Sequence, residues 1–517
     1  MKRKKSTKQT RVTGPQKKQS AGRKDRGKGS PRSFSKKTVA RKDERTKGRK
    51  DFPVVAIGAS AGGIEAISKL LENLSPKLGM AYVIIQHLAP DHESILPELL
   101  ERKTSMPVNQ VEDGMLVKTD NVYVIPPNTY MSIADGHLRL SPRVKSDGAY
   151  HSIDFFLNAL APVYKNKAIA VILSGSATDG SLGVQSIKAE GGITFAQDDS
   201  AKFLGMPLSA IDSGFIDFIL SPKEIAKQLE SFPKIIYSIA AARKPAETSE
   251  TELKKIYFLL HNKHGVDFSY YKPNTINRRI QRRMLLHSKT KAADYVKYLQ
   301  QNADEVELLY RDLLINVTSF FREPRSYALL AERIFPALMK HRDPNNALRI
   351  WVPACASGEE TYSIAICLFE LLKERSVQAP IQIFATDINE KAIEKARMGV
   401  YSKASLEKVS AKRLKDYFIK LDDNYQIVKS IRDVCVFAPH NLLKDPPFSR
   451  MDLISCQNIM IYLQNAGQKK ILTTFHYALN DGGFLLLGKS ETGTGVPDLF
   501  ASASGIPGCP AACAARC

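Results

Sequence analysis

The sequence predicts an α/β protein in which two doubly wound, mainly parallel sheets are joined through a small all-helical domain and preceded by a disordered basic tail. Short apolar runs alternate with helical patterns in two stretches of the chain, which is typical of parallel sheets flanked by helices. The stretch between them shows helical spacing alone, and the first 50 residues contain almost no large apolar side chains. We therefore expect a disordered tail at 1–50, an α/β domain at 51–235, a linker at 236–250, a helical domain at 251–325, a second α/β domain at 326–495 and an atypical, disordered tail at 496–517.

The basic residues of the chain are concentrated in the N-terminal tail. The chain has 75 Lys and Arg against 53 Asp and Glu, and residues 1–50 hold 21 of the basic residues but only 3 of the acidic ones. The rest of the chain is close to neutral, with 54 basic and 50 acidic side chains, which disfavours a general nucleic-acid-binding protein. The tail buries too little apolar surface to offset the entropy of ordering. We expect either a solvated segment or a tether to anionic polymers or a membrane surface.

The elements of the first α/β domain follow from its apolar runs. Buried strands are expected at 53–58, 81–85 and 168–173, and helices at 64–74 and 182–189. The runs at 122–125 and 137–140 predict an inserted β-hairpin, and the unit is expected to end near Pro233. In the second half, a helical stretch from 252 to 320 precedes strands expected at 348–352, 381–385, 434–437, 451–454 and 484–487.

A serine lies in a glycine-rich turn between the first strand and the first helix. The segment Gly58-Ala-Ser60-Ala-Gly62-Gly63 matches G-x-S-x-G, in which a sharp turn exposes a serine hydroxyl. The N-terminus of the following helix offers backbone N–H groups to developing negative charge. The same kind of turn also binds phosphates. The motif alone therefore leaves both an esterase-type nucleophile and a phosphate site open.

Two further polar residues follow strands of the same predicted sheet. His87 comes directly after the strand at 81–85, and Asp179 follows the strand at 168–173. A single histidine at a strand end is usually structural. Open α/β sheets, however, place their sites at the carboxyl ends of strands, and Ser, His and Asp are the types needed for nucleophile, base and orienting acid. The chain order Ser, His, Asp differs from that of the α/β-hydrolase fold.

Four separated motifs of this domain resemble the CheB chemoreceptor methylesterases: Ile57-Gly-Ala-Ser-Ala-Gly-Gly63, Gln86-His87, Leu173-Ser-Gly-Ser-Ala-Thr-Asp-Gly180, and Gln197-Asp-Asp with Gly205-Met-Pro207. The resemblance covers about 52–232. It implies Ser60 as nucleophile, His87 as general base and Asp179 as its partner, in hydrolysis of receptor glutamate methyl esters to glutamate and methanol. Backbone N–H groups near Ser176 and the Ser60 turn would form the oxyanion hole.

Two departures from this family pattern concern residues around the oxyanion hole. Ala61 stands where Thr is common, and Ser176 stands where Met is common. Both changes look tolerable because the hole would use backbone groups. The family's usual receiver domain is not expected, since the basic tail lies in its place.

The second α/β domain has features of a nucleoside-cofactor site. A strand runs into the small-residue turn Ala354-Cys-Ala-Ser-Gly358, and the next strand ends at Asp387. An acid at the end of the second strand suits the two hydroxyls of a ribose. No G-x-G-x-x-G is present, which weakens the dinucleotide interpretation. Asp387 could equally be a helix cap, and the pattern does not choose between nicotinamide and a sulfonium donor.

Five motifs of the second half resemble the CheR methyltransferases: Asn316-Val-Thr-Ser-Phe-Phe-Arg322-Glu, Ala354-Cys-Ala-Ser-Gly-Glu-Glu360, Ala385-Thr-Asp387-Ile, His440-Asn441-Leu442-Leu, and Cys456-Gln-Asn458-Ile-Met-Ile-Tyr462. The match spans about 250–492 and implies methylation of receptor glutamates with S-adenosylmethionine. Cofactor contacts are implied for Asn316, Thr318, Arg322, Glu360, Asp387, Asn441, Leu442, Gln457 and Asn458, while Arg322 and Tyr462 would lie near the transferred methyl group. Gln457 stands where Arg is common and Thr361 where Pro is common.

The segment from Ile276 to Met284 predicts a basic amphipathic helix. At 100° per residue, Ile276, Ile280 and Met284 share one face, and Arg278, Arg279, Arg282 and Arg283 fall on the other side. Three interpretations remain open for these arginines: a solvated face, a nucleic-acid contact, or, from the CheR resemblance, docking on acidic receptor helices.

Cysteine usage and hydropathy give three further expectations. None of the seven cysteines forms a CxxC pair, and Cys509, Cys513 and Cys517 lack a fourth ligand or a nearby His, so no metal site is expected. No run of about 18 apolar residues is present, so no transmembrane helix is expected. A cytoplasmic protein with reduced thiols fits best.

The leading hypothesis is a bifunctional CheB–CheR hybrid that adds and removes methyl groups on glutamates of chemoreceptors or receptor-like helical proteins. The alternative is a non-catalytic or partly degenerate signalling scaffold that keeps both folds. The alternative rests on 501–517, whose Ala, Gly, Pro and Cys content predicts that no closing strand pair forms after the last strand.

Overall fold

The computed structural model describes residues 52–87, 95–143, 151–241, 248–314, 318–340, 346–406, 408–422, 424–491, 496, 498–502 and 512–515. The predicted tail at 1–50 lies outside these residues. No described helix is both long enough and apolar enough to cross a membrane.

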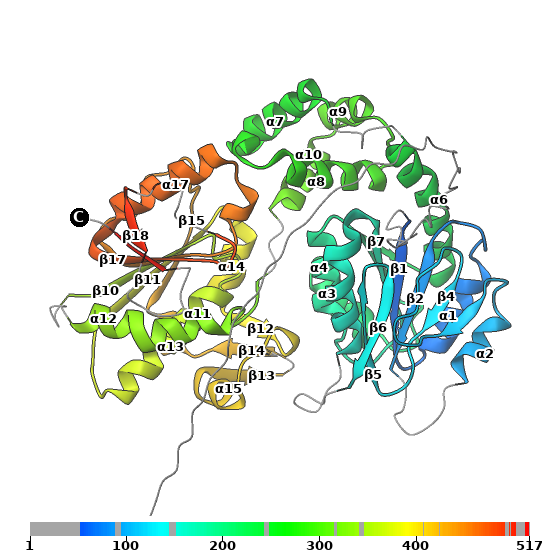
Figure 1. Cartoon of the computed structure of the whole chain (residues 1–517), viewed down its shortest axis with the longest axis horizontal. Coiled ribbons are helices and arrows are strands. Elements are labelled where there is room, and N and C mark those ends of the chain that lie inside the picture. The colour runs from blue at the N-terminus through cyan, green and yellow to red at the C-terminus, as the bar shows by residue number, and fades with distance from the viewer. Residues whose placement is uncertain are drawn as a thin grey trace, which may run out of the picture. The chain divides into compact units, whose positions relative to one another are not determined.

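The first α/β region is a seven-stranded sheet in which every strand pair is parallel (Figure 1). Its strand order is β3-β4-β2-β1-β7-β8-β9. The strands are β1 (Val54–Ala59), β2 (Ala81–Gln86), β3 (Val108–Gln110), β4 (Val122–Val124), β7 (Ala168–Ile172), β8 (Ile193–Gln197) and β9 (Phe218–Leu220). The expected strands and parallel arrangement are confirmed.

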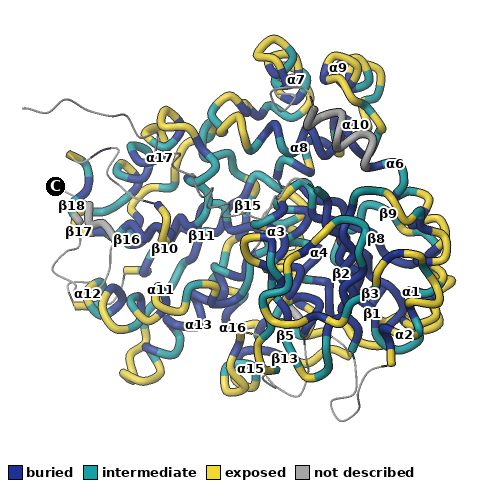
Figure 2. Tube along the Cα trace, turned by 45° about the vertical axis from the view of Figure 1, so that its right-hand side comes forward, coloured by how far each residue is buried: buried dark blue, intermediate teal, exposed yellow. Residues whose placement is uncertain are grey.

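Both faces of this sheet are covered by helices, so its central strands are buried throughout (Figure 2). Alternate residues of β1 enter two separate cores: Val55 and Ile57 on one face, Val54 and Ala56 on the other. The first face packs against α1 (Gly63–Glu72), α2 (Leu96–Glu101) and α6 (Pro222–Ala241). The second packs against α3 (Ser152–Tyr164), α4 (Ser181–Ala189) and α5 (Gly205–Asp212).

One expectation for this region is wrong in detail. The run at 122–125 is not half of a hairpin, because β4 pairs with β2 in the main sheet; the hairpin partner of β6 (His137–Pro142) is β5 (Thr129–Ala134). Helix α6 runs through Pro233, near which the unit was expected to end, and continues to Ala241. A proline is an unreliable sign of a helix end, because a long helix can tolerate the loss of the backbone hydrogen bond that proline cannot donate.

A cluster of helices follows, as expected. These are α7 (Glu250–His264), α8 (Pro273–Leu286), α9 (Ala292–Gln301) and α10 (Ala303–Leu313), with their apolar faces in one core. Ser249 caps α7 through a capping box with Glu252, which satisfies the first free backbone N–H groups of the helix. Helices α6 and α7 extend into the two ends of the linker expected at 236–250.

The second α/β region is also a seven-stranded sheet, with the order β15-β11-β10-β16-β17-β19-β18. Its strands are β10 (Leu348–Pro353), β11 (Ile381–Asp387), β15 (Cys435–Pro439), β16 (Met451–Cys456), β17 (Leu479–Leu487), β18 (Phe500–Ser502) and β19 (Ala512–Ala515). Helices α13 (Glu359–Glu374) and α14 (Glu390–Met398) contribute to the core on one face, and α17 (Asn465–Ala478) to the core on the other. A small three-stranded sheet, β12-β14-β13, is inserted between β11 and β15; its strands are Val400–Ser402, Asn424–Ile427 and Phe418–Leu421.

The expectation that no closing strand pair forms after β17 is wrong. Strand β19 pairs antiparallel with β17, and β18 pairs antiparallel with β19. A strand at a sheet edge can be held by backbone hydrogen bonds that small residues make as well as large ones. Composition alone therefore did not exclude these strands. The missing strand pair on which the scaffold alternative rested no longer supports that alternative.

Candidate functional sites

The three residues predicted for ester hydrolysis follow three adjacent strands, β2, β1 and β7. Strands β1 and β2 are paired with Ala59 opposite Gln86, so the next residues, Ser60 and His87, lie side by side at the carboxyl edge of the sheet. The His87 N–H donates to the Ala59 carbonyl (3.2 Å), which extends the ladder to this point. The parallel sheet thus brings together positions that are far apart in sequence.

The backbone of Ser60 is fixed by its turn. Its N–H donates to the Ser174 carbonyl (2.9 Å), and its own carbonyl accepts from the Gly63 N–H (2.9 Å) and the Gln86 side chain (2.7 Å). Gly62 has φ of 70°, and a Cβ there would lie 2.9 Å from the Ser174 Oγ. The turn therefore requires glycine both for its backbone conformation and for the close approach of Ser174.

Asp179 is a buried acceptor for three donors. Its Oδ2 accepts from His87 Nε2 (2.8 Å) and the Ile153 N–H (2.9 Å), and its Oδ1 accepts from the Asp154 N–H (2.9 Å). The two N–H groups belong to the first turn of α3, where the helix dipole also favours a negative charge. The acid is thus held beside His87 by a helix that the sequence motifs do not include.

The Ser60 hydroxyl is positioned less fully than the His87 and Asp179 side chains. No hydrogen bond joins Ser60 to His87 among the described residues. Because Nε2 is used for Asp179, Nδ1 is the ring nitrogen that remains for the hydroxyl. Such bonds are often long in the absence of substrate and tighten in the complex. The structure thus brings His87 and Asp179 into contact and places Ser60 next to them.

Ser174 and Gln197 support this edge of the sheet, a role that the sequence did not reveal. The Ser174 Oγ donates to the Ala61 carbonyl (2.8 Å) and accepts from the Phe203 N–H (3.0 Å), while the Ser174 N–H donates to the Gln197 Oε1 (3.0 Å). Ser176 is exposed in the following turn. These bonds connect the turns that carry Ser60 and Ser176.

A second set of polar residues lies at the ends of β11, β10 and β16, which are also adjacent strands. The turn after β10 places Ala354 and Ala356 at φ of 55° and 48°, a conformation that residues other than glycine seldom adopt. Asp387 at the end of β11 accepts from the Ala356 N–H (2.9 Å) and the Asn389 N–H (2.8 Å). The Asp387 side chain thus joins the turn to its neighbouring strand.

Asp387 is not the cap of the following helix. The side chain of Asn389 caps α14 by accepting from the Ala392 N–H (3.3 Å). Burial raises the pKa of Asp387, although the backbone N–H donors oppose this effect. The helix-cap alternative from the sequence is therefore excluded, and the buried acid remains available as a site residue.

Glu360, near the start of α13, has a strongly perturbed environment. Its Oε1 accepts from the Ser455 hydroxyl (2.6 Å) and from the Gln457 amide (3.1 Å), both of which are neutral. Burial raises the pKa of Glu360 to about 7, against the effect of these two hydrogen bonds. The carboxyl group can therefore exchange its proton near neutral pH.

Two adjoining pockets lie at these strand ends. Both pockets are lined by Ala354, Ile459 and Tyr462. Asp387, Asn441 and Leu442 line the first. The second is lined by Thr318, Arg322, Glu360, Gln457 and Asn458. The structure therefore gathers all the implied cofactor-contact residues that it describes, together with Tyr462; Asn316 lies outside the described residues.

Glu491 fixes the loop after β16, and the sequence analysis did not identify it as a site residue. This buried carboxylate accepts from the N–H groups of Asn458 (2.8 Å), Met460 (2.7 Å) and Gly488 (2.8 Å). In the sequence, the only indication of this role was that Glu491 is an acid shortly after β17. These bonds hold the backbone around Asn458, whose φ is 62°.

The arginines of α8 do not form a solvated face. Arg279, Arg282 and Arg283 are buried, and Arg278 is partly buried. Arg282 pairs with Asp217 and Asp312, and Arg283 pairs with Glu305. Ile276, Ile280 and Met284 share the core of the helical cluster, as predicted. The three buried arginines are therefore occupied by partners within the chain.

Comparisons with known proteins identify the domains in which these two groups of residues lie. Family models match residues 55–229 (CheB methylesterase), 251–314 (CheR methyltransferase, all-alpha domain) and 316–507 (CheR methyltransferase, SAM binding domain). S-adenosylmethionine is therefore the cofactor of the second α/β domain.

Curated relatives match either most of the chain or its second half. An uncharacterized 104.1 kDa protein of Rhodobacter capsulatus is 36% identical over 78% of this chain, and the chain spans only 45% of that relative's length. Chemotaxis protein methyltransferase 2 of Vibrio cholerae is 30% identical over 49% of this chain and 89% of its own.

Among solved structures, the catalytic domain of the Thermotoga maritima CheB methylesterase is 31% identical, covering 35% of this chain and 97% of its own, with a TM-score of 0.33. The chain belongs to the CheR methyltransferase family and carries a CheB methylesterase domain in the same polypeptide.

Proposed function

We propose that this chain is a bifunctional adaptation enzyme that methylates receptor glutamates and hydrolyses the resulting methyl esters. One observation carries the proposal: the same chain places Ser60 beside the His87–Asp179 pair and gathers the described cofactor-type residues at a second sheet edge. The chemotaxis relatives support chemoreceptors or receptor-like helical proteins as the partners.

Ester hydrolysis at the first site uses Ser60 as nucleophile. The Ser60 Oγ bonds to the ester carbonyl carbon while His87 takes its proton, and the backbone N–H groups near Ser60 and Ser176 stabilise the oxyanion. The C–OCH₃ bond then breaks, and methanol leaves with the proton from His87. Water attacks the acyl-enzyme by the reverse proton path, which yields glutamate and restores Ser60. Asp179 holds the imidazole and stabilises its cationic form.

The residues of the second site fit S-adenosylmethionine. Asp387 offers a buried carboxylate for ribose hydroxyls, Glu360 offers one for a cationic group, and Arg322 offers a guanidinium for a carboxylate. Amides of Asn441, Gln457 and Asn458 add neutral donors and acceptors. When bound, the cofactor supplies an electrophilic methyl group.

The chain's own task in methyl transfer is orientation. A substrate glutamate is already nucleophilic at neutral pH, so no strong general base is required. Arg322 and Tyr462 line the pocket that also contains Glu360 and can orient the incoming carboxylate and exclude water. We propose that these two side chains position the substrate, and that Arg322 together with the remaining residues holds the cofactor.

The test uses S-adenosylmethionine carrying a tritiated methyl group, together with receptor-rich membranes. Base-labile label on receptor protein supports methyl transfer, and its loss with Asp387→Ala ties transfer to this site. Volatile label that is released by the wild type but not by Ser60→Ala supports ester hydrolysis. If neither reaction occurs with any receptor preparation, the chain is a signalling scaffold and the proposal fails.

A further inference from the structure

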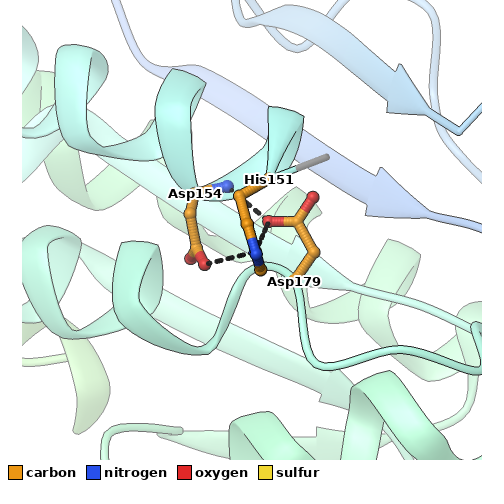
Figure 3. Close-up of side chains that lie close together, drawn as sticks. All are labelled: His151, Asp154 and Asp179. Atoms are coloured by element: carbon orange, nitrogen blue, oxygen red, sulfur yellow. Dashed lines mark hydrogen bonds and ion pairs between the residues drawn. The ribbon is translucent and has the colours of Figure 1, made fainter. Parts of the chain in front are cut away.

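A second histidine approaches Asp179 on the side opposite His87. His151 precedes α3, and its Nδ1 lies 4.0 Å from the Asp179 Oδ1 and 4.0 Å from the Asp154 Oδ2 (Figure 3). This Nδ1 is buried and makes no hydrogen bond. The Asp179 carboxylate therefore contacts one imidazole through Oδ2 and faces another at Oδ1.

We propose that His151 is a positioning residue of the esterase site that shares the Asp179 carboxylate with His87, so that the two imidazoles take up protons as a linked pair. The mechanistic consequence rests on the proposed esterase function. The linkage itself rests only on the geometry of His87, His151, Asp154 and Asp179.

The charged groups around His151 favour this arrangement. Asp154 faces it from α3, where its other oxygen, Oδ1, accepts from the Gly183 N–H (2.6 Å) and is thereby fixed. Asp179 faces it from the turn before α4. Among the described residues, Arg143 at the end of the hairpin is a cation on this side, and it donates to the Ser152 Oγ (2.8 Å), next to His151 in the sequence. The two carboxylates each approach the His151 Nδ1 to 4.0 Å.

Protonation of one histidine then disfavours protonation of the other. A cationic His151 partly neutralises the Asp179 charge, so Asp179 holds a proton on His87 less strongly. By linkage, a cationic His87 has the same effect on His151. His151 thus keeps His87 in its basic, neutral form at a lower pH than Asp179 and Asp154 would otherwise permit.

Two substitutions separate charge from packing. In His151→Asn the side-chain amide can place a donor near the position of Nδ1 but does not titrate, whereas His151→Leu removes both functions. Full-length protein labelled with ¹³C-histidine allows each imidazole to be titrated by NMR, with His87 assigned from His87→Asn. We expect the His87 titration midpoint to rise by roughly half a unit to one unit in both His151 variants.

The control is His137→Asn, which changes a histidine on the β5–β6 hairpin whose Nδ1 bonds to the Asp135 carbonyl (3.0 Å). This variant should leave the His87 midpoint where it is in the wild type. A His87 midpoint that moves by less than about 0.2 units in both His151 variants would overturn the linkage.

Hydrolysis of a methyl-esterified receptor provides the second readout. The acid limb of the rate profile should move to higher pH in both His151 variants, and at pH 8 the Asn variant should be faster than the Leu variant. An acid limb that stays in place while the NMR midpoint moves would refute the positioning role. If the wild type hydrolyses no ester but the His87 midpoint still moves, the linkage stands and only the proposed esterase function fails.

Discussion

The two sites share an architecture but differ in how their acids are held. Each site lies beyond the carboxyl ends of three adjacent parallel strands. In the esterase site, Asp179 accepts from two backbone N–H groups and an imidazole before any substrate is present. In the methyltransferase site, the described hydrogen-bond partners of Glu360 are a hydroxyl and an amide, both neutral. Burial raises the pKa of Glu360 to about 7, against these bonds and the smaller opposing effect of the Arg322 charge.

The difference follows from what each site has to bind. Ester hydrolysis creates a cationic imidazole from the protein's own side chain, so the compensating carboxylate has to be in place and oriented beforehand. A methyltransferase site receives its positive charge from outside, with the cofactor's amine and sulfonium groups. A buried acid without a cation can then be ionised by the ligand that it binds.

The largest expected effect tests the esterase half of this comparison. Asp179→Asn keeps the size of the side chain but removes its charge. The new amide can also face the His87 Nε2 with a donor N–H where Asp179 has an acceptor oxygen. We expect ester hydrolysis to fall by about 10³- to 10⁴-fold, while binding of S-adenosylhomocysteine by calorimetry is retained. The exposed Asp199 provides the matched control, and Asp199→Asn should hydrolyse normally. A loss below tenfold for Asp179→Asn would show that Asp179 is not the partner of His87.

A buried acid that already has a cation within the chain should behave differently from Glu360. Burial alone would raise the pKa of Asp217, but Arg282 and Lys188 lower it below its usual value. Arg282→Met leaves the buried Asp217 and Asp312 carboxylates without this partner. We expect a loss of about 3–5 kcal/mol in the free energy of unfolding measured in urea.

The control for this substitution is Arg278→Met, because Arg278 and Glu190 form a partly exposed pair (2.7 Å). This change should cost at most about 1 kcal/mol. Equal losses for the two variants would mean that Arg282 contributes no more than a surface charge.

Cofactor binding should depend on pH through Glu360. The folded-state pKa is raised from its usual value near 4.5 to about 7, so folded protein keeps a proton between these values that the unfolded chain releases. This group's contribution to stability therefore declines as pH rises through that window, whereas binding of a cation improves. Affinity for S-adenosylmethionine should rise by up to about tenfold per pH unit from 5.5 to 7 and then level off.

Two measurements identify the cause of this pH dependence. Glu360→Gln should bind more weakly at pH 8 and lose the dependence below pH 7. Calorimetry with S-adenosylhomocysteine, which keeps the amine but lacks the sulfonium charge, shows which cation Glu360 recognises. If Glu360→Gln follows the wild-type profile, another group is responsible.

The elements near these sites were predictable to different degrees. Buried strands such as β1 and β2 are continuous apolar runs, and their carboxyl ends placed Ser60 and His87 at a sheet edge from sequence alone. Asp387 was placed in the same way at the end of β11. The hairpin was misassigned because a short apolar strand does not reveal which neighbour it pairs with, and β4 joined the main sheet. The strand β19 was missed because its residues carry no β pattern.

Long-range hydrogen bonds were the least predictable feature. Asp179 is held by the first turn of α3, and the Asn458 loop is held by Glu491; neither relation has a fixed sequence spacing. For the arginines of α8, periodicity predicted only that they lie opposite the apolar face, and it left a solvated face, a nucleic-acid contact and receptor docking open. Periodicity reports which residues share a face but not whether that face finds buried acids such as Asp217 and Asp312.

The smallest expected effect separates the two influences on Glu360. Ser455→Ala removes the 2.6 Å hydrogen bond that favours the carboxylate, so the pKa of Glu360 should rise and the midpoint of cofactor binding should move above pH 7 by about one unit. Gln457→Arg places a cation beside the same oxygen and should move that midpoint below pH 7. Shifts in opposite directions would show that burial sets the high pKa of Glu360 and that its neutral hydrogen-bond partners do not lower this pKa to the usual value of a carboxyl group. A midpoint that both substitutions leave in place would mean that Glu360 does not carry the pH dependence, and the contrast with Asp179 would then be one of geometry rather than of charge.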